Sequence, residues 1–147
     1  MLVAYAACTV TLFITVKFSN FYGANMNEHP PEDSVLGKQP PVPADIARRQ
    51  RNIMNNLENV GFDLTLFWAA LVAVVVQAGG SVAAPQEALA LTVLICTYTA
   101  ARVGFTASYV NALQPHRTIC FVIGTACSLA AAGVLLSSAA HSYMLAV

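Results

Sequence analysis

Residues 48–77 read RRQRNIMNNLENVGFDLTLFWAALVAVVVQ. The later part of this stretch, residues 57–77, is mostly apolar and matches the roughly 20 residues that a helix needs to cross a bilayer. The earlier part carries arginine, asparagine and glutamate side chains at helical spacing. The stretch therefore predicts a long helix that crosses a membrane and is polar at one end.

The composition of the whole chain agrees with a membrane protein. Of 147 residues, 57% are hydrophobic and 10% are charged, whereas a soluble domain carries roughly 25% charged residues. The seven basic and seven acidic residues cancel, so the chain has no overall basic field to attract nucleic acid. An ordinary soluble domain is therefore excluded, and nucleic acid is not an expected partner.

Three further apolar stretches complete a predicted all-α fold, an integral membrane four-helix bundle with a single domain over residues 1–147. The predicted spans are residues 2–18, 46–77, 86–113 and 117–145, and residues 19–45 form the first connection. Every proline lies in a connection, as expected because lipid cannot replace the backbone donor that proline lacks. No basic residue precedes the first span, which argues against the alternative of a cleaved signal peptide.

The basic residues give the predicted bundle an orientation. The second connection and both termini carry no lysine or arginine. The basic side chains flank the first and third connections: Lys17, Lys38, Arg48, Arg49, Arg51 and Arg117. By the positive-inside rule these two connections face the cytosol.

Several polar side chains fall inside the second predicted span, where an ionised group costs roughly 2.5 to 3.5 kcal/mol. Arg48, Arg51, Asn55 and Glu58 follow one another at steps of three or four residues, so they share one helix face. We expect this face to avoid lipid. For Arg48 the alternative is an anchor to lipid headgroups. Asp63 lies off the face and has no predicted role.

The third span repeats the pattern with Arg102, Thr106 and Tyr109. With about 1.5 Å of rise per residue, both polar faces lie in the cytosolic half at overlapping depths. Arg117 enters at the same end. The pattern predicts a polar cavity between helices, open to the cytosol, that suits a small and mostly anionic ligand. The alternative is that Glu58 and Arg102 simply neutralise each other.

The cysteines indicate no chemistry of their own. They lie in apolar runs without a Cys-x-x-Cys spacing: Cys8, Cys96, Cys120 and Cys127. We interpret them as small buried hydrophobic residues. The sequence therefore predicts no disulfide, no metal site and no redox chemistry by protein thiols.

Three segments resemble one known family. Residues 48–62 are similar to an R-x-x-x-N-x-x-E-N signature, and residues 102–109 with 114–117 are similar to R-x-x-H-T-x-x-Y and Q-P-x-R elements. A weaker match is Pro31-Glu32-Asp33 followed by Gly37. These elements resemble the MAPEG family, the membrane-associated proteins of eicosanoid and glutathione metabolism, in its microsomal glutathione transferase and prostaglandin E synthase branch.

The resemblance implies a homotrimer that binds glutathione between neighbouring subunits. It implies these glutathione ligands: Arg48, Arg51, Asn55, Glu58, Arg102, Tyr109 and Arg117. It also implies four residues with a part in catalysis: Arg117, Tyr109, Thr118 and Asp33. The implied location is the endoplasmic reticulum of a eukaryote or the inner membrane of a bacterium, with the site facing the cytosol.

The charged groups of glutathione are complementary to the side chains of the two polar faces. Arginine pairs bidentately with carboxylates, and Glu58 could accept from the glutathione ammonium. An unperturbed thiol has a pKa of about 8.5, and only the thiolate attacks, so a nearby guanidinium such as Arg117 would activate it. A hydrophobic second substrate would arrive through the bilayer. Attack on carbon gives a transferase and attack on a lipid hydroperoxide gives a peroxidase, and the sequence does not choose between them.

Departures from the family patterns favour the general glutathione transferase branch over a dedicated eicosanoid synthase or isomerase. Phe105 stands where the family commonly has His or Tyr, Met54 replaces an Arg of the prostaglandin synthase pattern, and Asn59 replaces a Tyr of the leukotriene synthase pattern. Two alternatives remain. One is a non-catalytic, lipid-binding member of the superfamily, and the other is an unrelated small membrane transporter.

Overall fold

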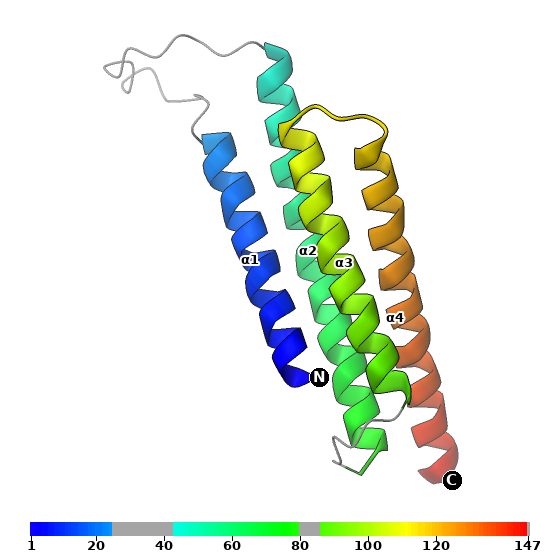
Figure 1. Ribbon diagram of the computed structural model, residues 1–147. Helices are drawn as coiled ribbons and strands as arrows, with labels where there is room; N and C mark the ends of the chain where they lie inside the picture. The colour runs from blue at the N-terminus through cyan, green and yellow to red at the C-terminus, as the bar shows by residue number, and fades with distance from the viewer. Residues whose placement is uncertain (25–42, 80–85, 147) are drawn as a thin grey trace.

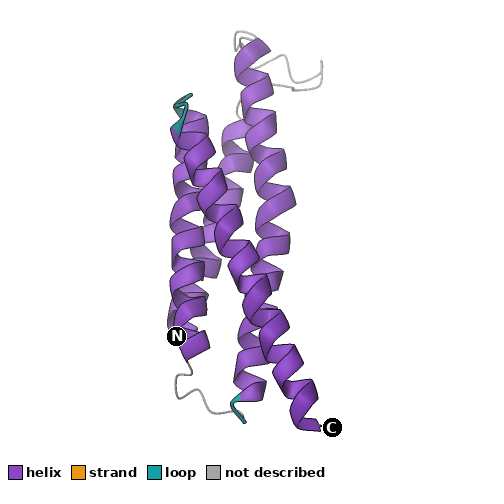
Figure 2. Cartoon of the chain, turned by 90° about the vertical axis from the view of Figure 1, so that its right-hand side faces the viewer, coloured by secondary structure: helices purple, strands orange, loops and turns teal. Residues whose placement is uncertain are grey.

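The computed structural model describes residues 1–24, 43–79 and 86–146, so the predicted catalytic residue Asp33 lies outside the described residues. The chain forms four helices, α1 (Leu2–Ala24), α2 (Pro43–Gln77), α3 (Gln86–Val110) and α4 (His116–Ala146). Each is long and apolar enough to cross a membrane. Helices are the only regular elements in the described part of the chain (Figure 2). The prediction of an all-α, four-helix membrane fold is confirmed.

Several helix ends differ from the predicted spans. α2 begins at Pro43, three residues before the predicted start, and α4 is one residue longer than predicted at each end. α1 continues past residue 18 to Ala24, because the polar Ser19 is buried against α2 instead of marking the end of the helix. α3 ends at Val110, before residue 113. There Ala112 takes a φ of 56°, and the Leu113 N–H donates to the Ser108 carbonyl at 2.8 Å. This left-handed C-terminal turn reverses the chain into α4.

The helices pack around a central pair. α2 and α3 contact each other, α1 packs on both from one side, and α4 packs on both from the other, while α1 and α4 share no contact in the described ranges (Figure 1). Both termini lie at one end of the bundle, and the α3–α4 turn lies at the other. The start of α2 and the end of α1 lie at that second end too.

The half of the bundle nearer the termini has an apolar core. Trp68 donates from its indole nitrogen to the Thr9 hydroxyl at 3.1 Å and meets the Tyr5 ring edge-on at 5.5 Å, so it packs α2 against α1. Asp63, which had no predicted role, accepts from the buried Tyr98 hydroxyl at 2.7 Å. Asp63 thus satisfies a phenol that would otherwise lack a partner within the span.

Large apolar side chains cover the outside of the bundle. Phe62 is 80% exposed, and Leu129 and Leu136 are each about 70% exposed. Such a surface would be an aggregation hazard in water, but lipid chains are as apolar as these side chains. The outer surface therefore agrees with an integral, multi-pass membrane protein.

Candidate functional site

The buried Arg102 of α3 organises the polar end of the bundle. It is only 2% exposed. Its Nη1 donates to Asn55 Oδ1 at 3.1 Å, and its Nη2 donates to the Asn55 carbonyl at 3.0 Å and to Asn56 Oδ1 at 3.1 Å. The polar faces of α2 and α3 therefore meet at the same depth.

Arg102 does not pair with Glu58. Among the described residues its oxygen partners are amide and carbonyl oxygens, and no carboxylate lies in hydrogen-bond contact with it. The alternative in which Glu58 and Arg102 neutralise each other is therefore wrong for the single chain. The reason is that Asn55 and Asn56 lie on the side of α2 that packs on α3, whereas Glu58 faces away.

Asn56 extends this contact to a third helix. It is fully buried, and its Nδ2 lies 2.7 Å from Ser19 Oγ on α1 and 3.0 Å from Thr106 Oγ1 on α3. Asn52, one turn earlier, lies 3.4 Å from both Ser19 Oγ and the Asn56 amide. We call Ser19, Asn52, Asn56, Arg102 and Thr106 the buried polar cluster.

Three members of this cluster, Ser19, Asn52 and Asn56, were not predicted as important. The available signal was the spacing of four residues between Asn52 and Asn56, which places two amides on one face of an otherwise apolar span. The predicted site instead comprised the charged residues of the neighbouring helix face.

A hollow of about 190 Å³ lies beside the cluster, between α2, α3 and α4. Its wall consists of polar and aromatic residues: Asn55, Phe105, Tyr109, Arg117, Thr118 and Phe121. The α3–α4 turn makes this wall possible, because it brings Arg117 back over α3. The Arg117 guanidinium lies 4.5 Å from the centre of the Tyr109 ring. This cation–π contact holds the guanidinium in place, and because the ring is uncharged, it does not neutralise the positive charge.

The hollow offers hydrogen-bond donors. Within the described ranges the Arg117 guanidinium and the Tyr109 hydroxyl have no hydrogen-bond partner. Because Arg102 carries only donors, the atom of Asn55 that faces it must be the oxygen. Asn55 therefore keeps its Nδ2 donor for a ligand. Thr118 donates to Gln114 Oε1 at 3.4 Å.

The other predicted ligands do not line this hollow. Arg48 is half-buried near the start of α2, and Arg51 and Glu58 are exposed on the outer face of that helix. In the part of the chain that the structure describes, Arg51 and Glu58 make no hydrogen bond or ion pair. The structure thus brings Asn55 together with residues of α3 and α4 and leaves Arg51 and Glu58 apart from them.

Comparison with known proteins gives one match. The family model described as the MAPEG family matches residues 1–137. Searches of the curated proteins and of the solved structures gave no match. The family match covers all four helices except the last part of α4.

Asn56→Leu tests the buried polar cluster. Leucine has a similar size but cannot bond Ser19, Thr106 or Arg102, so the free energy of unfolding should fall by about 2 to 4 kcal/mol. Thermal unfolding in detergent measures the change. Asn111→Leu is the matched control, because Asn111 is exposed just after the end of α3 and its side chain bonds only to the carbonyl of Ala107. Equal melting temperatures for the two variants would contradict the role of the cluster.

Proposed function

The chain belongs to the MAPEG family, and on that premise we propose that it is a membrane glutathione transferase of the microsomal type. It would bind glutathione at the polar end of the bundle and activate the thiol for attack on a hydrophobic or lipid electrophile. The observation that carries this proposal is the hollow in which Asn55, Tyr109 and Arg117 keep donors without partners in the described chain. Family membership removes the alternative of an unrelated transporter.

These donors suit the anionic groups of glutathione. The tripeptide has two carboxylates and a thiol that becomes a thiolate. The Arg117 guanidinium and the Asn55 amide would bind these groups, and the guanidinium stays charged in a dry site. Arg102 would act as a positioning residue, since its bonds to Asn55 fix the direction of the amide. Arg48 would remain at the rim as a weaker electrostatic contact.

One chain supplies only part of the proposed site. Pockets for ligands of this size measure roughly 300 Å³ or more, whereas the hollow measures about 190 Å³. Arg51 and Glu58, the proposed partners of a glutathione carboxylate and of its ammonium, are exposed on the outer face of α2. We therefore infer that a neighbouring subunit completes the site and that the protein is a homotrimer.

The outer face of α2 supports this assembly. Small residues recur at every fourth position along it: Gly61, Thr65, Ala69 and Ala73. All four are exposed or half-buried in the single chain, and such a spacing lets helices approach closely in a membrane. Glu58 at the end of the same face is an ionisable group, which is unfavourable against lipid. A subunit packed on this face would cover the small residues and remove the charge from lipid.

The proposed chemistry begins with the thiolate. Arg117 would stabilise it by charge, with Tyr109 as a second donor and Thr118 as a hydroxyl beside them. Asp33 remains a proposed contributor from the connection between α1 and α2. Phe121 is 39% exposed and also lines the hollow, so an apolar substrate could reach the thiolate from the lipid side. Conjugation and hydroperoxide reduction would both start from this same thiolate.

Asn55→Asp tests glutathione binding without disturbing Arg102. Aspartate keeps an oxygen toward the guanidinium but replaces the free amide donor with a second anionic oxygen. The dissociation constant for glutathione, measured by calorimetry in detergent, should rise by about ten-fold or more, while the melting temperature stays the same or rises. Asn111→Asp adds the same charge outside the hollow and should bind normally. Unchanged binding by Asn55→Asp would contradict the proposed role of Asn55. No binding by the wild type would contradict the proposed function and favour a non-catalytic, lipid-binding protein.

Arg117→Ala tests thiol activation separately. Removal of an adjacent positive charge should raise the pKa of the bound glutathione thiol by about one unit or more. The thiolate absorbance in the ultraviolet, titrated against pH, measures this pKa. Arg117→Lys keeps a point charge and should recover part of the shift. The same thiol pKa in wild type and Arg117→Ala would remove Arg117 from its proposed role.

Gly61→Leu tests the assembly. A Cβ atom added at Gly61 would meet nothing within 4 Å in the single chain, and the same holds for Gly133 on α4. If α2 packs against a neighbour, Gly61→Leu should break the trimer, whereas Gly133→Leu should leave it intact. Native mass spectrometry of the detergent-solubilised protein distinguishes the two results. A trimer in both variants would place the subunit contact elsewhere.

A further inference from the structure

Two thiols from different helices lie in contact on the side of the bundle away from the glutathione hollow. Cys8 Sγ on α1 and Cys96 Sγ on α3 are 3.8 Å apart, and the residues are 88 positions apart in the sequence. All four cysteines of the chain are free thiols. The hollow has walls from α2, α3 and α4, so this thiol pair is not part of it.

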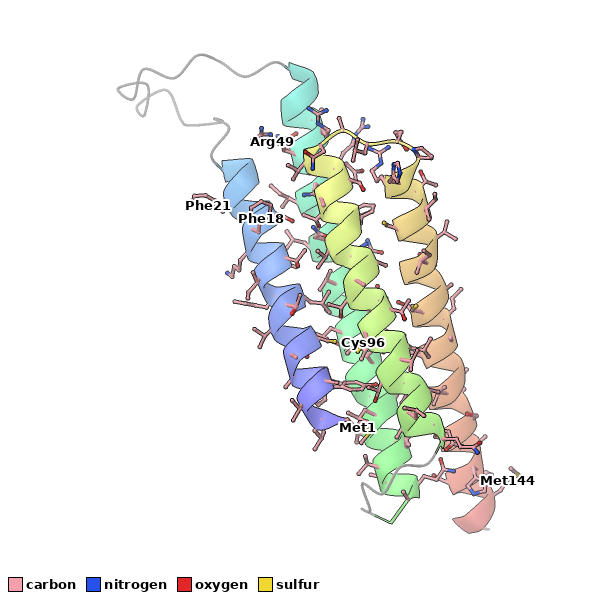
Figure 3. All side chains as sticks on the ribbon, in the orientation of Figure 1. Met1, Phe18, Phe21, Arg49, Cys96 and Met144 are labelled. Carbon is pink, nitrogen blue, oxygen red and sulfur yellow. The ribbon has the colours of Figure 1, made fainter. Side chains whose placement is uncertain are left out.

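The two thiols differ in their access to the surroundings. Cys8 is 8% exposed and belongs to the apolar core, whereas Cys96 is exposed on the outside of the bundle. Figure 3 shows Cys96 about midway along the bundle, where α3 faces α1. The expectation that all the cysteines are buried is therefore right for Cys8 and Cys127, but Cys120 is half-buried and Cys96 is exposed. Cys96 is open to lipid and lies next to the buried thiol of Cys8.

The depth of the pair selects the reagents that can reach it. At about 1.5 Å of rise per residue, Cys96 lies about 15 Å from the first residue of α3, Gln86. The hydrocarbon core of a bilayer is about 30 Å thick, so this position is close to its centre. A lipid-soluble oxidant can reach Cys96, while an oxidant that stays in water cannot.

We propose that Cys8 and Cys96 form a redox-active dithiol that reduces a lipid hydroperoxide and closes to a disulfide between α1 and α3. Cys96 is the attacking thiol because it is the exposed one, and Cys8 is the resolving thiol because it lies directly behind. The sulfur atoms must close from 3.8 Å to the bond length of about 2.05 Å. This proposal does not depend on glutathione binding.

The two steps balance. In the first, Cys96 Sγ attacks the terminal peroxide oxygen, the O–O bond breaks, and the thiol proton passes to the departing alkoxide. The products are a sulfenic acid on Cys96 and a lipid alcohol. In the second, Cys8 Sγ attacks the Cys96 sulfur, the S–O bond breaks, and the hydroxyl leaves as water with the Cys8 proton. One hydroperoxide thus becomes one alcohol and one water, and two thiols become one disulfide.

Cumene hydroperoxide, a lipid-soluble organic hydroperoxide, is the probe for this reaction. The full chain is reconstituted in phosphatidylcholine liposomes without glutathione, treated with the probe, alkylated in denaturant and digested without reductant. Mass spectrometry should find a Cys8–Cys96 cross-linked peptide, with two thiols lost for each cumyl alcohol formed. Hydrogen peroxide at the same concentration should react about ten-fold more slowly. Equal rates for the two peroxides, or loss of thiols without this cross-link, would overturn the proposal.

Single substitutions assign the two roles. Cys8→Ser should stop at the sulfenic acid of Cys96, which dimedone traps, and Cys96→Ser should neither react nor cross-link. Cys127→Ser, which removes a buried thiol of α4, is the matched control and should cross-link as the wild type does. A sulfenic acid on Cys8 in Cys96→Ser, or a disulfide between two subunits, would contradict the assignment. Because no glutathione is present, failure here leaves the proposed transferase activity untouched.

Discussion

The guanidinium of Arg102 has to find its hydrogen-bond partners inside the protein. It cannot lose its proton, and no carboxylate contacts it in the described part of the chain. Burial of a charge without hydrogen bonds costs several kcal/mol even after the protein relaxes. Oxygen atoms of Asn55 and Asn56 accept from both terminal nitrogens of the guanidinium, while its Nε has no partner among the described residues. These bonds favour one register between α2 and α3. Asn56 then carries the constraint to α1 through Ser19.

The same bonds connect packing to the proposed chemistry. Arg102 takes the oxygen of the Asn55 side chain and thereby leaves its amide hydrogens for the hollow. On α3, Phe105 lies between Arg102 and Tyr109, with the Arg102 guanidinium 5.0 Å from its ring and the Tyr109 ring 4.8 Å away. Contacts of the buried polar cluster thus position Asn55 and Phe105, which line the hollow. The turn after α3 fixes its outer wall by placing Arg117 over Tyr109.

Much of the fold could be predicted from the sequence, because spanning helices depend on length and apolar content, which are local properties. The meeting of the polar faces of α2 and α3 at one depth followed from the rise per residue. The sequence could not predict which residues of the polar face of α2 pack inside the bundle and which stay exposed. Helical spacing shows which residues share a face, but not how far the neighbouring helices cover that face. Asn55 packs inside the bundle against Arg102, while Arg51 and Glu58 stay exposed.

The thiol pair shows the same limit for contacts between distant segments. Nothing local in the sequence of α1 or α3 indicates that they are neighbours, and Cys8 meets Cys96 only because α1 packs on α3. Because α3 packs between α4 and α1, it presents different reactive side chains to the two neighbouring helices. Toward α4 it presents Tyr109 at the polar end, beside the hollow proposed for glutathione. Toward α1 it presents Cys96 at mid-depth, beside the thiol of Cys8. One helix therefore separates a proposed glutathione thiolate from a protein dithiol, and each thiol meets a different population of electrophiles.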